Sequence, residues 1–425
     1  MKKLAGGHKF YYNFFFYLIL IFSKNLFAVQ IYDYQTEEFI KKINTEILSV
    51  NSYNKDINFK IFKDNFPNAF VTEDNTIYLS SGLLAYSPDY VSLLGVLAHE
   101  IGHIEKYHVA KRKKEINNLK NISSYGNLAA VIGSMIMQEP NIINAIVVNQ
   151  TTLNNLFINF SQDQEIEADF YAIETIHRLK LPSNSIKKFL LILEDKTKFN
   201  LIDEELKKFS THPIFEKRYE ILDYKDIDES KNFNQNFQKE FKFIQVKFMA
   251  YTNIDLVTNL KNDYKIYYDS IQFSKEGNLI ESLKKINLLI SKYDKNHFLI
   301  ETKADILLSY GYNNEAIKFY RKVLNYQPNN NYVKYNIFIN LDLNETEIKF
   351  NKKIFLNNLN LLKYFPNNKN IITQYYNLVK LLEYDEWILF FEILLFDKKD
   401  SKIKLNKLKK QTKDYNLKKI IKLYT

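Results

Sequence analysis

Two histidines one helical turn apart are the residues of this chain best suited to chemistry. His99 and His103 stand in the sequence HEIGH, inside a stretch with a helical pattern, so their side chains lie on one helix face. Zinc–nitrogen bonds of about 2.0–2.1 Å allow both rings to bind one ion there. Glu100 is rotated by about 100° around the axis, where its carboxylate can accept a proton from a zinc-activated water. The pattern therefore predicts a zinc site for hydrolysis.

A second motif, which begins 62 residues after His103, supplies carboxylates that can complete the zinc site. Glu165 and Asp169, in EIEAD, are again one turn apart on a predicted helix over 161–179. A catalytic zinc takes three protein ligands and keeps one position open, so we expect Glu165 to be the third ligand. We expect Asp169 to accept the ring N–H of a ligating histidine, and Glu167 to face solvent. The alternative is an accidental HExxH match on a buried helix, and the second motif argues against it.

Histidine is rare in this chain, which has seven, and a third candidate follows the two motifs. His212, in STHP, precedes a proline that restrains the backbone, and Arg218 comes six residues later on a predicted helix. His212 has three interpretations: it donates a hydrogen bond to the oxyanion of the reaction, it is a fourth zinc ligand that keeps the enzyme latent, or it is a structural turn residue. We expect His108 to pack or hydrogen-bond near the end of the first helix.

Composition excludes several classes of protein. The 425 residues are 46% hydrophobic and 25% charged, which is too apolar for a disordered chain and sufficient for two or three domains. Cysteine is absent, so any metal must be bound by histidine and carboxylates. The formal net charge is +10, but the first 28 residues hold four lysines and no acidic residue. The remaining 55 basic and 49 acidic residues require no nucleic-acid partner.

The first 28 residues have the three-part layout of a secretory signal. Lysines precede the apolar run 14–22, and Ala28 is a small residue at a plausible cleavage point. The run is shorter than the roughly 20 residues that a spanning helix needs, so we expect export to the periplasm. An uncleaved N-terminal anchor that tethers the protein is the alternative, because Leu26 is not a small residue.

The segments around the motifs predict an α+β fold that is mostly helical. Apolar and polar residues alternate over 57–61, as in a half-buried strand. The segments 68–72 and 76–79 flank a turn and predict a hairpin, hence a small antiparallel sheet. Helical patterns cover 33–49, 89–113 and 161–179. The apolar span 126–148 is broken at Pro140 and predicts two short buried helices rather than a membrane crossing.

Beyond a polar boundary at 223–236 the chain repeats with a period of 34 residues. Gly277 matches Gly311 and Leu289 matches Val323, which resembles the tetratricopeptide repeat, a helix–turn–helix unit. Stacked units of this kind make concave protein-binding surfaces. A plain helical bundle is the alternative. The predicted domains are a signal peptide (1–28), a metallopeptidase domain (29–225), a linker and connecting helix (226–262), helical repeats (263–400) and a basic C-terminal helix or tail (401–425).

Together these features resemble the gluzincin metallopeptidases that include HtpX and the CAAX prenyl proteases. The segments that carry the resemblance are Asn68-Ala69-Phe70, Gly82-Leu83-Leu84, HEIGH at 99–103, EIEAD at 165–169, and His212-Pro213 with Arg218. The signal sequence and the 34-residue repeats are similar to those of the soluble, periplasmic BepA-like branch.

The resemblance implies one zinc ion, bound by His99, His103 and Glu165, with Glu100 as general base and acid. It also implies that Arg218 and Asp169 support the ligands, and that His212 regulates access to zinc. Asn68, Ala69 and Phe70 would form an edge strand that binds polypeptide substrates by β-augmentation.

The BepA-like branch implies work on stalled outer-membrane barrel proteins, with the assembly machinery bound through the repeats. An assembly factor with a silent zinc site is the alternative. The basic segment 401–425 is expected to be a solvated helix that caps the repeats, with peripheral membrane contact as its alternative.

Overall fold

The computed structural model describes residues 30–51, 56–111, 114, 162–199, 218, 220, 232–252, 260–343, 348–397 and 400–425. They form two compact units that divide before Leu260. Among the described residues, no helix has both the length and the apolar character to cross a bilayer. His212, the predicted signal at 1–28 and the apolar span 126–148 lie outside the described residues.

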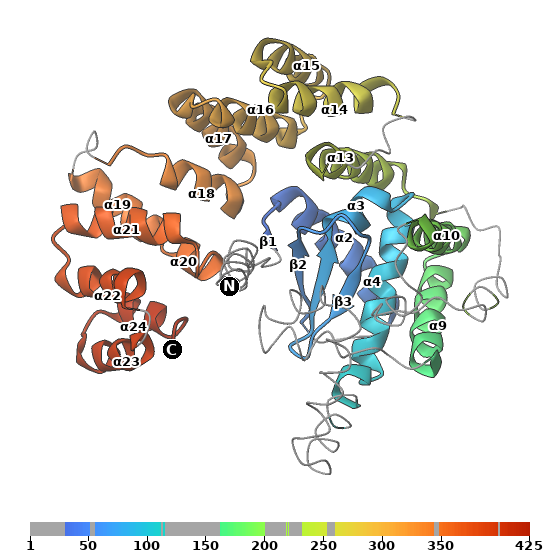
Figure 1. Cartoon of the computed structure of the whole chain (residues 1–425), viewed down its shortest axis with the longest axis horizontal. Coiled ribbons are helices and arrows are strands. Elements are labelled where there is room, and N and C mark those ends of the chain that lie inside the picture. The colour runs from blue at the N-terminus through green and yellow to red at the C-terminus, as the bar shows by residue number, and fades with distance from the viewer. Residues whose placement is uncertain are drawn as a thin grey trace, which may run out of the picture. The chain divides into compact units, whose positions relative to one another are not determined.

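A four-stranded sheet forms part of the first unit (Figure 1). Its strands are β1 (Gln30–Ile31), β2 (Asn58–Phe62), β3 (Ala69–Val71) and β4 (Thr76–Ser80), in the order β1-β2-β4-β3. The predicted hairpin is confirmed, because β3 and β4 pair antiparallel. Asn75 adopts a left-handed φ of 57° in its turn, a conformation that asparagine tolerates better than most residues.

The prediction of an antiparallel sheet is wrong for the central pair, because β2 and β4 run parallel. The chain leaves β2, forms β3 at the edge of the sheet, and turns back so that β4 enters between β3 and β2. The outer pairs are antiparallel as predicted. Alternating apolar residues mark a strand but do not determine its neighbour.

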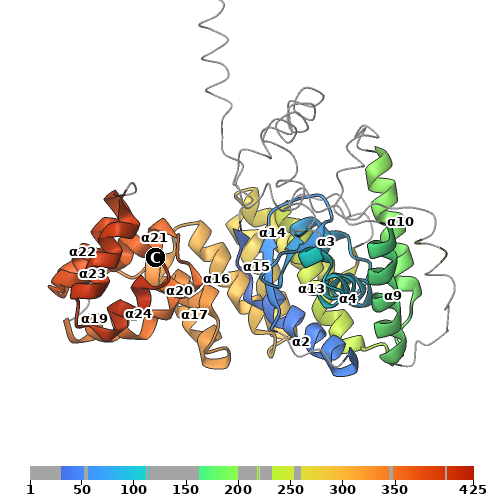
Figure 2. The ribbon, with the colours of Figure 1, turned by 90° about the horizontal axis from the view of Figure 1, so that it is seen from below.

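Helix α4 (Tyr90–Glu105) is the buried centre of the first unit. It begins with a capping box, in which the Ser92 N–H donates to the Asp89 carboxylate at 2.8 Å. Helices α9 (Gln162–Arg178) and α10 (Asn184–Phe199) pack along α4 (Figure 2). Because α4 is enclosed, its apolar residues extend around most of its circumference.

Helices α2 (Tyr34–Asn51), α3 (Ser81–Tyr86) and α13 (Gln235–Thr252) complete the first unit. Phe39 of α2 stacks on Phe241 of α13, with ring centroids 5.8 Å apart. The Gln245 amide of α13 donates to the carbonyl oxygens of Ala85 and Ser87. Residues 226–262 are predicted to be a linker and connecting helix. In the structure, Phe241 and Gln245 pack α13 into the first unit.

Among its described residues, the second unit consists of helices. Two successive helix pairs contain the matched residues Gly277 and Gly311, and further helices follow. They are α14 (Asn262–Lys275), α15 (Leu279–Lys292), α16 (His297–Ser309), α17 (Asn313–Tyr326), α18 (Asn331–Ile339), α19 (Ile348–Asn358), α20 (Asn360–Tyr364), α21 (Lys369–Leu381), α22 (Asp385–Phe396), α23 (Ser401–Gln411) and α24 (Tyr415–Ile421).

Residues matched at the 34-residue period have equivalent structural positions. Gly277 and Gly311 lie in the turns that join the helices of each pair, with left-handed φ of 85° and 80°. Leu289 and Val323 are fully buried on the second helix of each pair. The repeated sequence therefore produces a repeated helix–turn–helix geometry.

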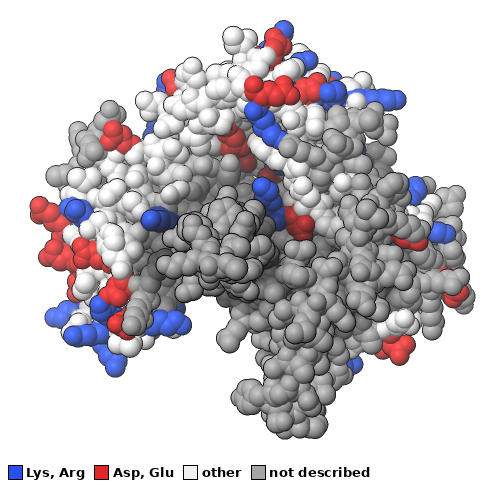
Figure 3. Space-filling view, in the orientation of Figure 1, with Lys and Arg blue, Asp and Glu red and all other residues white. Residues whose placement is uncertain are grey.

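Helices α23 and α24 make up the lysine-rich end. Leu405, Leu408 and Leu417 are buried against neighbouring helices, whereas Lys402 and Lys407 are exposed. Lysine and arginine side chains gather at the lower left of Figure 3, over this end of the second unit.

Candidate metal centre

The closest approach of α4 and α9 brings the two sequence motifs together. A Cβ atom added to Gly102 would lie 3.1 Å from the Cβ of Tyr171 and 3.2 Å from the Cα of Ala168. Ala168 itself is fully buried. Small residues on both helices therefore allow the backbones to approach.

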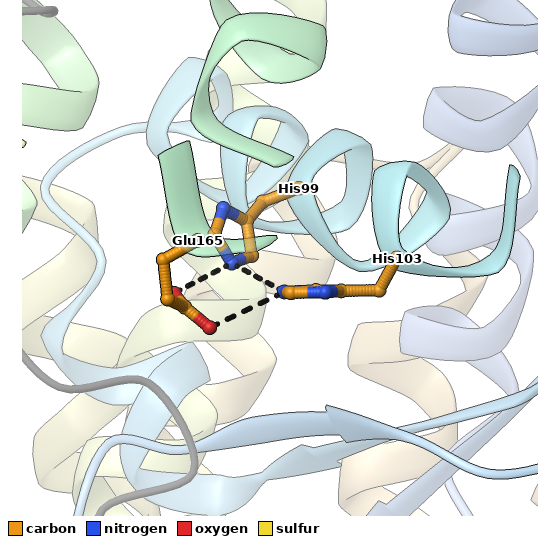
Figure 4. A group of neighbouring side chains, drawn as sticks. All are labelled: His99, His103 and Glu165. Atoms are coloured by element: carbon orange, nitrogen blue, oxygen red, sulfur yellow. Dashed lines mark hydrogen bonds and ion pairs between the residues drawn. The ribbon is translucent and has the colours of Figure 1, made fainter. Parts of the chain in front are cut away.

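His99, His103 and Glu165 converge on one point between these helices (Figure 4). The Nε2 atoms of the two rings are 3.0 Å apart. Glu165 Oε2 lies 3.4 Å from His99 Nε2, and Glu165 Oε1 lies 3.5 Å from His103 Nε2. All three side chains are buried, and their ligand atoms lie within 4.8 Å of one another. One ion at about 2 Å from each atom is compatible with these separations.

A carboxylate and a guanidinium orient His99. The Nδ1 atom of His99 is 2.9 Å from Asp169 Oδ1, and Arg218 donates to both oxygens of Asp169 at 2.7 and 2.8 Å. An ionised carboxylate only accepts hydrogen bonds, so Nδ1 of His99 carries a proton, and Nε2, which faces Glu165, is the atom that can bind a metal. Arg218 Nη1 also lies 3.3 Å from Glu165 Oε2. The structure thus brings Asp169 and Arg218 together beside the ligand candidates.

Neighbouring charges decide the protonation of this cluster. Burial would raise the pKa of Asp169, but the Arg218 guanidinium and the hydrogen bond from His99 hold it below its ordinary value. Burial would lower the pKa of His99, but Asp169 and Glu165 raise it above its ordinary value. Because a protonated ring cannot bind a metal, an ion in this site takes the place of that proton.

The donor set fits zinc. Two imidazole nitrogens and one carboxylate oxygen are a known ligand set of catalytic zinc sites, which keep a further position open. Glu100 follows His99 in α4 and is only 1% exposed. Its charge contributes to the raised pKa of Arg218, so it lies within electrostatic reach of the same cluster. His99, His103 and Glu165 would hold the metal, and Glu100 is available for proton transfer.

Comparison with known proteins agrees with this geometry. Residues 34–226, which contain α4, α9 and the strands β2, β3 and β4, match peptidase family M48. The chain carries a peptidase family M48 domain. Both sequence motifs belong to this domain, whereas β1 and α13 lie outside the matched residues.

Two curated relatives share part of their length with this chain. The chain is 25% identical over 192 residues to the beta-barrel assembly-enhancing protease of Yersinia pestis, a match that covers 45% of this chain and 39% of the relative. It is 25% identical over 182 residues to the protein of the same name from Escherichia coli K12, covering 43% and 37%. The matches thus span less than two-fifths of each relative.

Strand β3 of the M48 domain contains Ala69 and Phe70, and Asn68 directly precedes it; these are the three residues expected to bind substrate. It lies against α4 at the edge of the sheet. Its ladder with β4 uses the carbonyl of Asn68 and the N–H of Thr72, so the peptide groups of the intervening Ala69 and Val71 face away from β4. Among the described residues, no strand pairs with that outer side.

The structure adds two residues to this site that the sequence analysis did not assign. α4 ends at Glu105 rather than at 113, and Tyr107 adopts a left-handed φ of 57°. This reversal brings His108 Nδ1 to 2.9 Å from His103 Nδ1, and His108 Nε2 to 3.0 Å from Glu167 Oε2. Glu167 is exposed, as expected, with 54% of its side chain accessible, and its carboxylate also pairs with His108. Tyrosine gives no sequence signal for such a reversal.

Proposed function

We propose that this chain is a zinc-dependent endopeptidase of the cell envelope, which hydrolyses peptide bonds in misfolded or stalled outer-membrane proteins. The observation that carries the proposal is the buried convergence of His99, His103 and Glu165 within an M48 domain. Burial on two packed helices gives this trio a fixed geometry, which a catalytic site needs.

Each residue of the site has a definite task in this reaction. The trio would hold one zinc ion, which would supply a Lewis acid to activate water and polarise the scissile carbonyl. Glu100 accepts the proton of the attacking water and delivers it to the leaving amine as the C–N bond breaks. Asp169 and Arg218 orient His99. His212 is proposed as the hydrogen-bond donor to the oxyanion, or as the zinc ligand of a latent state.

Substrate recognition is proposed at the outer edge of β3. An extended polypeptide can pair with the outward peptide groups of Ala69 and Val71, in the manner of an added strand. Main-chain pairing of this kind accepts many sequences, as expected for an enzyme that acts on misfolded proteins. The peptide groups of Asn68 and Phe70 face β4 and so support the strand that binds the substrate.

The cellular role is inferred from the relatives, from the N-terminal segment 1–28 and from the helix pairs of the second unit. The names of the relatives connect M48 domains of this type with the assembly of β-barrels. The secretory layout of residues 1–28 favours the periplasm, and the repeated helix pairs of the second unit favour a docking function for partner proteins. We therefore propose that the second unit brings outer-membrane substrates or their assembly machinery to the protease.

Replacing Glu100 with glutamine tests the proposed reaction. We expect Glu100→Gln to retain zinc and the folded structure but to lose casein hydrolysis by at least about 100-fold, because the amide cannot accept the proton of water. Zinc content and circular dichroism serve as checks on the site and the fold. Glu174→Gln on α9, whose carboxylate pairs with the exposed Arg178, is the matched control. Unchanged casein hydrolysis by Glu100→Gln would rule the mechanism out.

A second function is favoured by the two successive helix pairs α14–α17. In this alternative the chain is an assembly factor, and the zinc site is latent. Glu100→Gln would then preserve the cellular role, whereas loss of the second unit would abolish it. Measurement of outer-membrane protein assembly in cells that carry each variant separates the two functions.

A further inference from the structure

We propose that His108 and Glu167 form a positioning relay for His103, separate from the Asp169–Arg218 pair that orients His99. The inference rests on the proposed function, because it takes His103 to be a zinc ligand. The relay consists of two hydrogen bonds, from His103 to His108 at 2.9 Å and from His108 to Glu167 at 3.0 Å.

The direction of both hydrogen bonds follows from the chemistry of the groups. Nε2 of His103 faces the Nε2 of His99 and Glu165, so it must carry a lone pair to bind a metal. A neutral imidazole has only one N–H, and that of His103 is therefore on Nδ1, where it donates to Nδ1 of His108. The N–H of His108 is then on Nε2, where it donates to the Glu167 carboxylate.

Burial makes the relay specific to this tautomer. His108 is fully buried and lies between His103 and the Glu167 carboxylate. If the carboxylate of Glu167 were absent, His108 could carry its proton on Nδ1 and face His103 with a donor. The carboxylate thus excludes the arrangement in which two N–H groups oppose each other.

The two candidate ligand histidines are consequently oriented by different sets of hydrogen-bond partners. Asp169 and Arg218 are both buried beside His99. The relay of His103 ends instead at a carboxylate whose side chain is 54% exposed. Glu167 can therefore be changed without opening the core, and the relay can be tested from the surface of the molecule.

The experiment measures zinc affinity, which does not depend on proteolysis. Metal-free full-length protein is titrated with zinc against a chromogenic chelator, and cobalt-loaded protein is examined by absorption spectroscopy for changes in ligand geometry. We expect His108→Phe, which cannot accept from His103, to weaken zinc binding by about 10- to 100-fold. His108→Gln offers an amide oxygen as acceptor and is expected to recover part of the affinity.

Glu167→Ala removes the acceptor of the His108 N–H. It is expected to weaken zinc binding less than His108→Phe and to alter the cobalt spectrum in the same direction. Glu174→Ala is the matched control, because Glu174 lies on the same helix with a side chain that is 56% exposed. The relay is overturned if Glu167→Ala behaves like this control. It is also overturned if His108→Phe lowers the melting temperature of the metal-free protein while its zinc affinity stays at the parental value.

Failure of the relay and failure of the proposed function give different results. If the parent protein binds zinc tightly and both variants bind it equally well, only the relay is wrong. If the parent protein itself fails to bind zinc, the proposed function is wrong. Should His108→Phe not fold, the zinc affinity of Glu167→Ala decides between the outcomes, since the Glu167 side chain is half-exposed and its loss does not open the core.

Discussion

At the scale of single residues, the ligand cluster depends on a buried cation being matched by carboxylates. Arg218 is 4% exposed and donates to both oxygens of Asp169, while it also lies near Glu165. A guanidinium in such a place is stable only with its partners, because removing one partner of a buried ion pair leaves an uncompensated charge. Asp169 therefore serves the fold and the metal site together.

We expect Asp169→Asn to reduce zinc affinity by about 10- to 100-fold, because the amide is a weaker acceptor for His99. The same change should lower the free energy of unfolding of the metal-free protein by about 3–5 kcal/mol, since Arg218 loses a charged partner. Urea denaturation and zinc titration measure the two effects. Glu174→Gln, at an exposed ion pair, should change stability by less than about 1 kcal/mol. Equal stability of Asp169→Asn and the parent would contradict this account.

The sequence predicted the residues of the site wherever helical periodicity relates them. His99 with His103, and Glu165 with Asp169, are one turn apart, and a third ligand was required by the coordination of zinc. His108 could not be assigned in this way, since its position depends on the left-handed backbone of Tyr107. The pairing of Glu167 with His108 then follows from tertiary structure alone. The role of His212, which lies outside the described residues, stays a prediction.

At the scale of elements, one turn geometry recurs between the helices of the second unit. Gly277, Gly311 and Glu383 all have left-handed φ values, of 85°, 80° and 55°. In each turn the N–H of this residue donates three residues back, and the next N–H donates five residues back. The third turn therefore has the glycine geometry without the glycine, which explains why the repeat is hard to recognise there from sequence.

We expect Glu383→Gly to raise the free energy of unfolding of the second unit by about 0.5–1 kcal/mol. A left-handed conformation costs a residue with a Cβ atom about 1–2 kcal/mol, and glycine's freedom in the unfolded chain offsets part of this gain. Gly311→Ala, in the equivalent turn, should destabilise the unit by about 1 kcal/mol, because it places a Cβ atom on a residue with a left-handed φ. Chemical denaturation of the two variants provides the measurement, and changes of the same sign would refute the shared geometry.

The sheet marks another limit of prediction from local pattern. The β3–β4 hairpin was predictable because both strands and their turn lie within a short segment. The parallel pairing of β2 with β4 was not, because it depends on β3 taking the edge of the sheet. Similarly, α13 was assigned to a connecting segment, although Phe241 and Gln245 attach it to α2 and α3.

At the scale of the whole molecule, each of the two units has a core of its own. Ile43, Leu94 and Leu97 are fully buried, or nearly so, in the first unit, and Ala316, Tyr320 and Val323 are fully buried in the second. The candidate metal ligands all belong to the first unit. Under the proposed function, metal binding would therefore stabilise one of the two cores directly.

Removal of metal with a chelator should lower the unfolding temperature of the first unit and leave that of the second unchanged. Zinc at 100 times its dissociation constant adds about 2.7 kcal/mol to the stability of the unit that binds it. Differential scanning calorimetry with and without chelator measures this difference, and the Glu383→Gly variant identifies the transition of the second unit. A transition of the second unit that shifts on chelation would contradict the assignment.

The separation of the ligands along the chain has a consequence for when activity can begin. The two histidines come from α4, whereas Glu165 comes from α9 and lies beside them because the two helices pack closely where Gly102 meets Ala168. A newly synthesised chain thus offers a pair of imidazoles without their carboxylate partner, which is a poor chelator. Under the proposed function, the nascent protease cannot cleave other polypeptides during export, because its zinc site is complete only when the domain has folded.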